Sequence, residues 1–567
     1  MKHDEIDSGD FAVDLLYPSQ QKRIELKKRR NQLAEYPQSY LKSLELETVA
    51  KIISSYNVHY TMNIFSEMCM DTDVISYRLD ILEDFLNVPT LSTTIKRIIN
   101  VMIENDRKNI YKLSEPDSFD VLNDAITAFD GYIECMDIMH GFIEKHSKEI
   151  KSVGVRKMFD FFEENYRNKH FNSLRTELGE LKESIRNNIR SITVAINLDE
   201  RMVPVSAGII NYSKDPYILK PSLFDKILYH GANFSKDKIV KNMRNKYINS
   251  EATNERIVNT ADENLFKELS FITDKYIQMI DDVLAEYQKI GFKDMQHINY
   301  QLEYYMGAVN LIKLCENTGL KMCRPKLLEP KLRTAKIKGI FDLVYMSESK
   351  VWNLNHNDKR SVITNDIEFD NNSRMYILTG ANNGGKTTFV RAIGICQVLA
   401  QAGLYVPAET CEISIADFIY THFPKEEQIG IDASKFTSEI KEFKIISNTI
   451  TPESLLLMNE SIQSTTPNEC IEISKELLKI FCTIGVRGIL ATHLIDLVSV
   501  IDEINDDSDI RSKVCSIVMT VDKKTGERLY KIKKDYPTKT SYSGTILSKF
   551  GIDMSEINNR LSKSHYV

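Results

Sequence analysis

Residues Gly380 to Thr387 have the types and spacing of a loop that binds phosphate. They spell G-x-x-x-x-G-K-T, the Walker A pattern, in which glycines let backbone N–H groups close around phosphate oxygens. We expect Lys386 to reach the β- and γ-phosphates and the Thr387 hydroxyl to bind Mg²⁺. The pattern predicts that the chain binds ATP or a similar nucleotide. The candidate phosphate-binding residues are Gly380, Ala381, Asn382, Asn383, Gly384, Gly385, Lys386, Thr387 and Thr388.

The segments on either side of this loop support the same interpretation. The apolar run Met375 to Leu378 has the length and composition of a buried strand. After the loop, apolar residues recur at spacings of three and four from Phe389 to Leu399, which predicts a helix. Strand, glycine loop and helix in this order are the context that the motif requires, and the N-terminus of the helix adds a favourable dipole.

Two more apolar runs end in residues that could act on a phosphate. The first, Ser454 to Met458, is followed by Asn459 and Glu460. In P-loop ATPases this position carries an acidic pair, in which the Asp supports Mg²⁺ and the Glu polarises the attacking water. Here Asn459 replaces the Asp, so it is a candidate Mg²⁺ residue without the negative charge. The second run ends at His493, which we interpret as a contact to the γ-phosphate.

The composition of the whole chain limits the classes of protein to consider. The 567 residues are 42% hydrophobic and 27% charged, as in a globular protein of several domains. The net charge of −7 gives no general attraction to nucleic acid. Nine cysteines without a C-x-x-C pair indicate reduced thiols in a cytoplasmic protein. No apolar run approaches the ~20 residues of a membrane span.

The periodicity of apolar residues predicts a helical N-terminal half. Residues 1–45 are expected to be a polar lead-in and a charged helix, and residues 46–323 a helical core and lever region with a long helix at 261–290. Alternating apolar residues within 191–212 predict a small β-hairpin inserted in this region. The basic cluster at 22–30 is either a solvated helix face or a patch that contacts phosphate.

The character of the sequence changes near Arg324, where short strands begin. We expect strands at 335–337, 342–344 and 362–364. The predicted fold is therefore multi-domain: an all-α N-terminal region with the hairpin insertion, and a C-terminal α/β domain that contains the P-loop. The expected ATPase domain covers residues 324–550, and a helical tail follows at 551–567.

The C-terminal half resembles the ATPase domain of the MutS DNA mismatch-repair family, which belongs to the ABC-type P-loop ATPases. The helical half resembles the core and lever helices of that family in its periodicity and in a few local stretches. The stretches that carry the resemblance are CRPKLLEP (323–330), TNDIEF (364–369), TGANNGGKTT (379–388), GLYVPAETCEI (403–413), DASKFTSEI (432–440), SLLLMNES (454–461), ATHLIDL (491–497) and SYSGTILSKFGI (541–552).

The resemblance implies a role for each matching residue. Glu460 matches the catalytic carboxylate of the family and His493 its γ-phosphate-sensing histidine. Ser434 matches the serine that reaches the γ-phosphate bound by the opposite subunit, and Asn365 falls where the family places an Asn near the adenine. The resemblance thus implies ATP and Mg²⁺ as cofactors, double-stranded DNA as a partner, and a head-to-tail homodimer as the working unit.

The chain also departs from the family pattern. Asn459 stands in place of Asp, and Asp432 and Ser464 stand where the family has glycine. Sequence of the helical-core type begins by about Leu44, so we expect the mismatch-reader and connector domains to be missing. The reader domain carries a Phe-x-Glu wedge, and two matches to that pattern, at 65–67 and 161–163, lie inside helical runs and are expected to be chance occurrences.

Two hypotheses about function remain. The first is an ATPase that forms an ATP-driven dimer clamp on DNA, in mismatch repair or related repair or recombination control. It would recognise branched or distorted DNA structure rather than single mismatches. The second is a nucleotide-clamped binding or scaffold module with negligible ATP hydrolysis. The rate of ATP turnover, with and without DNA, separates them.

Overall fold

The structure is a computed structural model, and two compact units can be distinguished in it. The first unit comprises residues 1–96, 146–158 and 297–567, and the second comprises 97–145 and 159–296. The expected domain boundaries near residues 45, 323 and 550 stay predictions. The structure describes residues 11–33, 39–54, 57–110, 118–188, 191–198, 200, 204–213, 215, 292–349, 362–381, 384–423, 432–462, 465–522 and 527–537.

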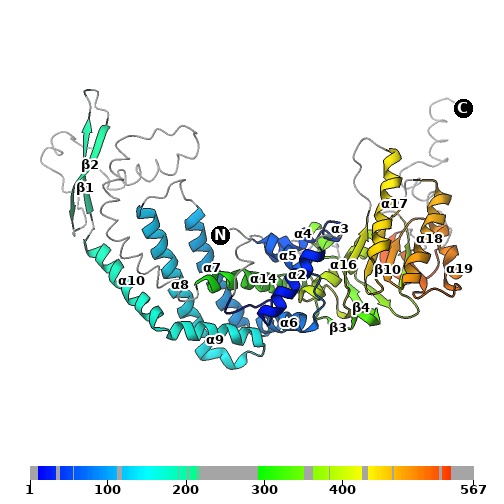
Figure 1. The fold of residues 1–567 in the computed structure, drawn as a ribbon, viewed down its shortest axis with the longest axis horizontal. Coiled ribbons are helices and arrows are strands. Elements are labelled where there is room, and N and C mark those ends of the chain that lie inside the picture. Colours follow the sequence, from blue (N-terminus) through cyan, green and yellow to red (C-terminus); the bar gives the residue numbers. More distant parts are fainter. Residues whose placement is uncertain are drawn as a thin grey trace, which may run out of the picture. The chain divides into compact units, whose positions relative to one another are not determined.

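Helices make up most of the described part of the N-terminal half, as the periodicity predicts (Figure 1). The helix α14 lies within the expected helical region 46–323, whereas the helix expected at 261–290 lies outside the described residues. The helices are α2 (Gln20–Leu33), α3 (Ser39–Ser43), α4 (Leu46–Ile53), α5 (Val58–Ser66), α6 (Thr72–Asn87), α7 (Pro89–Ile110), α8 (Ser118–His146), α9 (Val153–Arg167), α10 (Lys169–Asn188) and α14 (Phe292–Asn317).

Two antiparallel strands cover the range of the expected β-hairpin. They are β1 (Ser191–Leu198) and β2 (Pro204–Ser213), and their pairing places Ser191 opposite Ser213. The register shifts twice along the pair, once after Thr193 and once after Asn197. In Figure 1 the two strands follow directly on α10, so the chain passes from a helix into this small ribbon.

Two arginines of the basic cluster on α2 make contacts within the protein, whereas Lys28 of the same cluster is exposed. Arg29 donates hydrogen bonds to the carbonyl oxygens of Met68 (3.2 Å) and Asp417 (2.6 Å). Arg23 is buried and lies 3.7 Å from Asp14. These contacts explain a strongly charged helix at this position: its arginines connect α2 to neighbouring segments of the first unit.

Both Phe-x-Glu sequences lie in or at the end of helices, and their aromatic side chains are buried. Phe65 is 1% exposed at the end of α5, and Phe161 and Phe162 are buried in α9. Glu67 is itself buried, while Glu163 lies 2.6 Å from a ring nitrogen of His140. A wedge must project from the surface, so the interpretation of these matches as chance occurrences is confirmed.

The C-terminal half contains an α/β domain whose larger sheet has six strands in the order β12-β11-β6-β10-β9-β8. All neighbouring pairs are parallel except β11 with β12. Helices connect the parallel strands, as parallel pairing requires. The strands are β6 (Met375–Thr379), β8 (Ile419–His422), β9 (Leu455–Asn459), β10 (Arg487–Ala491), β11 (Val514–Val521) and β12 (Arg528–Lys534), and the helices are α16 (Lys386–Ala402), α17 (Asp432–Thr449), α18 (Pro467–Ile484) and α19 (Ile501–Asn505).

A second, smaller sheet contains both parallel and antiparallel pairs, in the order β3-β7-β4-β5. The expected strand at 342–344 is wrong, because Asp342 accepts a hydrogen bond from the Val344 N–H and caps the short helix α15 (Leu343–Glu348). The expected strand at 362–364 is also wrong, since the strand begins only at Asn365, where pairing with Ile340 starts. The strands are β3 (Lys326–Leu328), β4 (Ala335–Ile340), β5 (Asn365–Phe369) and β7 (Thr410–Ser414).

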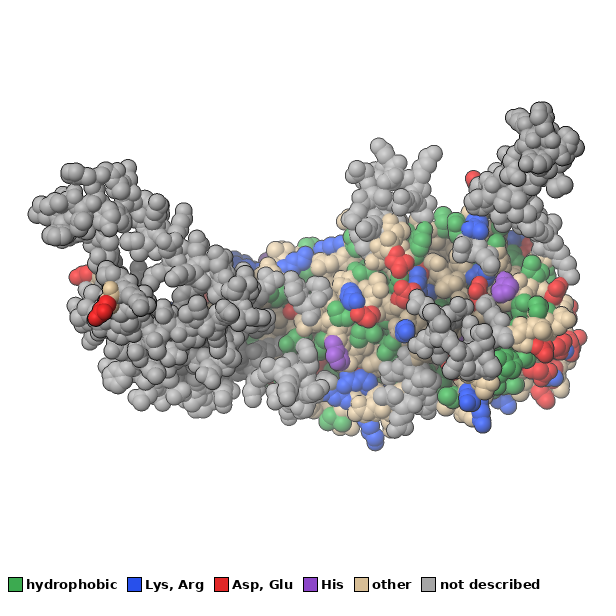
Figure 2. All heavy atoms as spheres, turned by 90° about the horizontal axis from the view of Figure 1, so that it is seen from above, with side chains coloured by type: hydrophobic (Ala, Val, Ile, Leu, Met, Phe, Trp, Pro, Cys, Tyr) green, Lys and Arg blue, Asp and Glu red, His purple; other side chains and the backbone are tan. Residues whose placement is uncertain are grey.

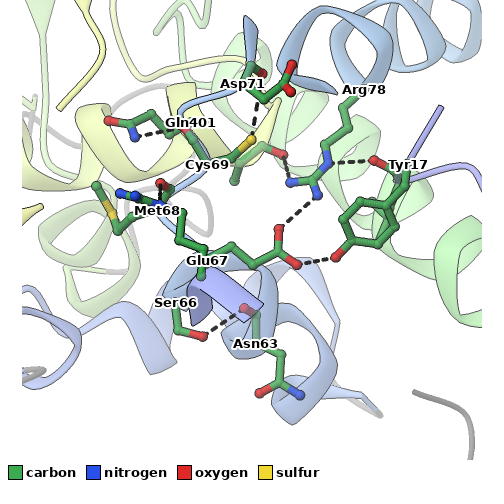
Figure 3. Close-up of polar contacts among 12 residues, drawn as sticks. Tyr17, Asn63, Ser66, Glu67, Met68, Cys69, Asp71, Arg78 and Gln401 are labelled. Carbon is green, nitrogen blue, oxygen red and sulfur yellow. Dashed lines mark hydrogen bonds and ion pairs between the residues drawn. The ribbon is translucent and has the colours of Figure 1, made fainter. Parts of the chain in front are cut away.

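A buried charge network connects the helical part of the first unit to the C-terminal end of α16 (Figure 3). Arg78 is fully buried and pairs with Glu67 at 2.8 Å, while its Nε donates to the carbonyl oxygen of Leu16 at 2.9 Å. The Tyr17 hydroxyl donates to the other oxygen of Glu67. Burial alone would lower the pKa of Arg78, but Glu67 holds the pKa well above its usual value. Gly403 packs directly on Arg78, where a side chain would not fit.

Two expectations about the whole chain can be compared with the structure. All nine cysteines are free, and seven of them are buried. Within the ranges that the structure describes, no helix has both the length and the apolar character needed to cross a membrane.

We predict that Arg78→Met lowers the free energy of unfolding by about 3–5 kcal/mol, because it leaves the buried Glu67 carboxylate without its charged partner. The matched control is Arg324→Met, since Arg324 pairs with half-exposed Asp80 and Glu83 on the same helix α6. That change should cost about 1 kcal/mol or less. Urea unfolding followed by circular dichroism measures both, and equal losses would contradict the assignment.

Candidate functional site

Three parallel strands bring the residues predicted to bind phosphate and to act in catalysis to one edge of the larger sheet. Ala491 of β10 is paired with Leu378 of β6 on one side and with Asn459 of β9 on the other. The three strands therefore end at the same level, and the residues that follow each of them meet there. In open sheets of this kind, ligands bind at the carboxyl ends of the strands.

The phosphate-loop motif follows β6 and leads into α16, as the sequence predicts. Gly385 has φ 91° and is the N-cap of the helix, a conformation that residues with a side chain adopt only with strain. At Gly380, a Cβ atom would lie 2.7 Å from Met519 of β11, so only glycine fits. Asn382 and Asn383 lie outside the described residues.

The Lys386 amine lies inside the loop. It donates to the carbonyl oxygens of Gly380 (3.0 Å) and Ala381 (3.3 Å) and lies 3.7 Å from Oε1 of Glu460. Burial lowers the pKa of this amine, and the Glu460 carboxylate partly offsets the effect. A buried ammonium group held at the N-terminus of a helix is well suited to bind an anion such as phosphate.

Thr387 and Asn459 lie together, as their predicted common role requires. The Thr387 hydroxyl is 3.2 Å from Oδ1 of Asn459 and donates to it. Hydroxyl and amide oxygens are hard donors of the kind that Mg²⁺ takes, and Mg²⁺ commonly has few protein ligands when phosphates supply the others. These two residues fit a Mg²⁺ ion, although neither of them carries a negative charge.

Glu460 has an unusual backbone conformation directly after β9. Its φ is 48°, in the left-handed region, and its N–H donates to the Ala491 carbonyl oxygen at 2.7 Å. Ile462 also has a positive φ, 60°. Such conformations cost about 1–3 kcal/mol each in residues other than glycine and are concentrated at functional sites. The turn directs the Glu460 carboxylate toward the amine of Lys386.

The structure shows fewer contacts for the two other predicted site residues, His493 and Ser434. His493 is exposed and lies two residues past β10, next to Thr492, whose N–H donates to the Leu378 carbonyl oxygen. Ser434 belongs to the first turn of α17, but its side chain lies outside what the structure describes. Both roles stay predictions.

A cavity of about 780 Å³ lies beside the phosphate loop, and its wall contains several residues that sequence reasoning missed. One end is formed by Gly384 to Thr388 and Glu460, and the rest is largely apolar or aromatic. Among the lining residues that were missed, only Tyr530 has a positive φ, 54°, and this backbone feature cannot be seen in the sequence. The residues that were missed are Ile340, Phe341, Asp342, Tyr345, Val362, Ile363, Phe389, Ala392 and Tyr530.

Asn365 lines this cavity, but its amide is bound to the protein itself. Nδ2 donates to the Tyr530 carbonyl oxygen at 3.0 Å, and Oδ1 accepts from the Ile532 N–H at 2.8 Å. The side chain thus connects β5 to the backbone of β12 and holds Tyr530 at the cavity wall. The expected contact of Asn365 with adenine stays a prediction.

An ion-pair cluster supports the cavity wall near α15. Nε of Arg391, on α16, donates to Oδ2 of Asp342 at 2.7 Å, and Nη1 pairs with Glu45 next to α4. Burial raises the pKa of Asp342, and Arg391 opposes this shift. The cluster connects the N-cap of α15 to the same helix that begins at the phosphate loop.

Comparison with known protein families identifies both halves of the chain. The family model for MutS domain V matches residues 376–562, and the model for the MutS2 N-terminal domain matches residues 70–317. Over these two ranges the chain matches models of the MutS family. The first match contains the phosphate loop and Glu460, and the second covers most of the helical region, so the resemblance seen in the sequence is confirmed.

Similar curated proteins are bacterial DNA mismatch repair proteins MutS. The chain is 36% identical over 141 residues to the protein of Thermosipho melanesiensis, 35% over 136 residues to that of Chlorobium phaeobacteroides, and 37% over 142 residues to that of Prochlorococcus marinus strain MIT 9312. These alignments cover 25%, 24% and 25% of this chain and only 17%, 16% and 15% of the respective relatives.

We predict that Asn365→Ala lowers the free energy of unfolding by about 1–3 kcal/mol, because it leaves backbone groups of β12 without partners. It should also weaken triphosphate binding, because Tyr530 is released from the cavity wall. Asn505→Ala is the matched control: Asn505 makes the same two bonds to the backbone of Val514, at 2.9 and 2.8 Å, without lining the cavity. Equal triphosphate affinity in the two variants would contradict the role given to Asn365.

Proposed function

We propose that the cavity beside the phosphate loop binds ATP with Mg²⁺ and that the chain hydrolyses this ATP. One observation carries the proposal. The carboxyl ends of β6, β9 and β10 are aligned, and Lys386, Thr387, Asn459 and Glu460 lie close together there. A buried cation, two hard oxygen donors and a carboxylate in this arrangement are the groups that phosphoryl transfer to water requires.

The lining of the cavity supports a nucleotide rather than a bare phosphate. The triphosphate would lie against Gly384 to Thr388, where the N-terminus of α16 favours negative charge. The base would extend toward the apolar and aromatic part of the wall, which includes Phe341, Val362 and Tyr530. Ligand cavities typically combine such apolar walls with a few placed polar groups.

The residues at the sheet edge account for the individual steps of hydrolysis. Water attacks the γ-phosphorus, the bond to the bridging oxygen breaks, and ADP and inorganic phosphate are released. Glu460 accepts a hydrogen bond from the water and orients it, while Lys386 stabilises the charge on the phosphoryl oxygens. Mg²⁺, when held by Thr387 and Asn459, supplies further charge neutralisation at the phosphates. His493 would contact the γ-phosphate.

We further propose that ATP joins two chains into a clamp on DNA. Ser434, at the start of α17, would contact the γ-phosphate bound by the partner subunit, so each nucleotide is enclosed only in a dimer. The DNA part of the proposal is supported by the two family matches and by the relatives, which are named as DNA mismatch repair proteins. On the face seen in Figure 2, basic and acidic side chains of the described residues are interspersed.

A scaffold with negligible hydrolysis is the second candidate, and Asn459 favours it. The amide oxygen of Asn459 already accepts the Thr387 hydroxyl, and it lacks the charge that would hold Mg²⁺ firmly. The presence of Glu460 next to Lys386 favours the ATPase. Turnover of ATP by the wild-type protein decides between the two.

We predict that Glu460→Gln binds ATP with nearly unchanged affinity, loses at least about 99% of hydrolysis, and accumulates as a nucleotide-bound dimer. Lys386→Ala should instead weaken binding of the triphosphate itself, because the loop loses its cation. Binding of a fluorescent ATP analogue, phosphate release and analytical sedimentation measure the three properties. Equal turnover in wild type and Glu460→Gln would refute the catalytic role.

We predict that DNA affinity falls steeply with salt, since phosphate contacts release counterions. Perfect duplex and duplex with a single mismatch should bind within about threefold of each other, whereas branched DNA should bind more tightly because a closed dimer selects shape. Electrophoretic titrations with these three DNAs at two salt concentrations measure this. A preference for the mismatch of tenfold, or about 1.4 kcal/mol, would refute structure recognition.

A further inference from the structure

His422 is a buried histidine at the end of β8 that none of the sequence motifs includes. It is 6% exposed, and its Nδ1 lies 2.9 Å from the hydroxyl oxygen of Ser461. The same hydroxyl donates to the carbonyl oxygen of His422 at 3.2 Å. Because a serine hydroxyl has one proton, Nδ1 must be the donor in the first of these bonds. Two hydrogen bonds therefore tie Ser461 to His422.

The other side of the imidazole ring rests on α17. The ring stacks on Phe443, with centroids 4.4 Å apart and planes 29° apart, and Nε2 lies 3.7 Å from Oε2 of Glu442. Both contacts come from the helix whose first turn carries Ser434. His422 is thus held between α17 and the segment that follows β9.

Ser461 directly follows Glu460, in a segment whose backbone needs support. Glu460 and Ile462 both have left-handed conformations, with φ of 48° and 60°. Such residues keep their conformation only when the surrounding contacts fix it. The bond from the Glu460 N–H to Ala491 fixes one side of Ser461, and the two bonds to His422 fix Ser461 itself.

We propose that His422 is a positioning residue for ATP hydrolysis, which holds Ser461 and thereby sets the place of the Glu460 carboxylate. The inference rests on the proposed ATPase function and assigns to it a residue outside the phosphate loop and the residues that follow β9 and β10. Orienting water for attack demands accurate placement, and displacement of a catalytic group by about 1 Å can cost 10²-fold in rate. Binding of ATP depends on the loop and on Lys386, neither of which is bonded to His422 in the contacts described above.

The test compares four variants by steady-state ATPase kinetics and by equilibrium binding of a fluorescent ATP analogue. His422→Phe keeps the stacking on Phe443 and removes the bond from Nδ1 to Ser461, while the backbone carbonyl oxygen of residue 422 stays as an acceptor. Ser461→Ala removes the hydroxyl. His422→Asn places an amide N–H near the position of Nδ1. Ser447→Ala is the matched control, because it deletes a hydroxyl on α17 that bonds only to Lys444 among the described contacts.

We expect kcat to fall about tenfold or more in His422→Phe and Ser461→Ala, with ATP affinity and KM within about threefold of wild type. His422→Asn should recover most of the lost rate, and Ser447→Ala should match wild type. The double variant of His422→Phe and Ser461→Ala should be no slower than Ser461→Ala alone, since the loss of the hydroxyl already removes the bond that His422→Phe removes. A merely structural defect would lower binding and rate together and would not be rescued by Asn.

Unchanged kcat in Ser461→Ala, or an equal loss of rate and ATP affinity in it, would overturn the proposal. Ser461→Ala decides the matter if His422→Phe does not fold, because it deletes only one oxygen atom. A wild-type protein that binds ATP without measurable turnover would refute the proposed ATPase itself. A wild-type protein with turnover and unaffected variants would refute only the role of His422.

Discussion

The candidate site depends on the register of three parallel strands, β6, β10 and β9, whose carboxyl ends are aligned. Because Leu378 and Asn459 are both opposite Ala491, the chain leaves all three strands at the same edge. Every residue of these three strands is buried, as in parallel strands that are covered on both faces, and the close packing of their side chains fixes the register. Shifting β6 or β9 by one residue relative to the other would move Glu460 away from the amine of Lys386, and the chemistry of the edge would be lost.

The helix α16 connects this edge of the sheet to other elements of the first unit. It begins at the phosphate loop, packs on β9 and β10, and contacts α5, α6 and α15. Two buried arginines fix it along its length: Arg391 by its bond to Asp342, and Arg78 by its contact with Gly403 at the end of the helix. Each guanidinium has a carboxylate partner, so the buried charges are compensated, and their geometry is specific to one arrangement.

Side chains that bond to the protein itself do as much to define the site as the groups that would contact a ligand. Asn365 holds β12, and with it the backbone of Tyr530, at the cavity wall. Ser461 stands between the left-handed Glu460 and Ile462, where a loose backbone would let the carboxylate move. A functional group is placed accurately only when the contacts around it allow no alternative position. In this protein those contacts come from β8, β12 and α17, which are distant in the sequence from the groups that they support.

The sequence by itself determined the glycine-rich loop motif, the buried strands that precede Glu460 and His493, and the helical character of the N-terminal half. These features are local: a glycine pattern, a short apolar run and a helical period are each complete within a few consecutive residues. Only the tertiary structure decided that Asp342 caps a helix instead of entering a strand, that the Asn365 amide is bound by β12, and that His422 bonds to Ser461. Asn365 and His422 have partners 167 and 39 residues away. No local pattern can show such a contact, because it exists only once the strands have been brought together.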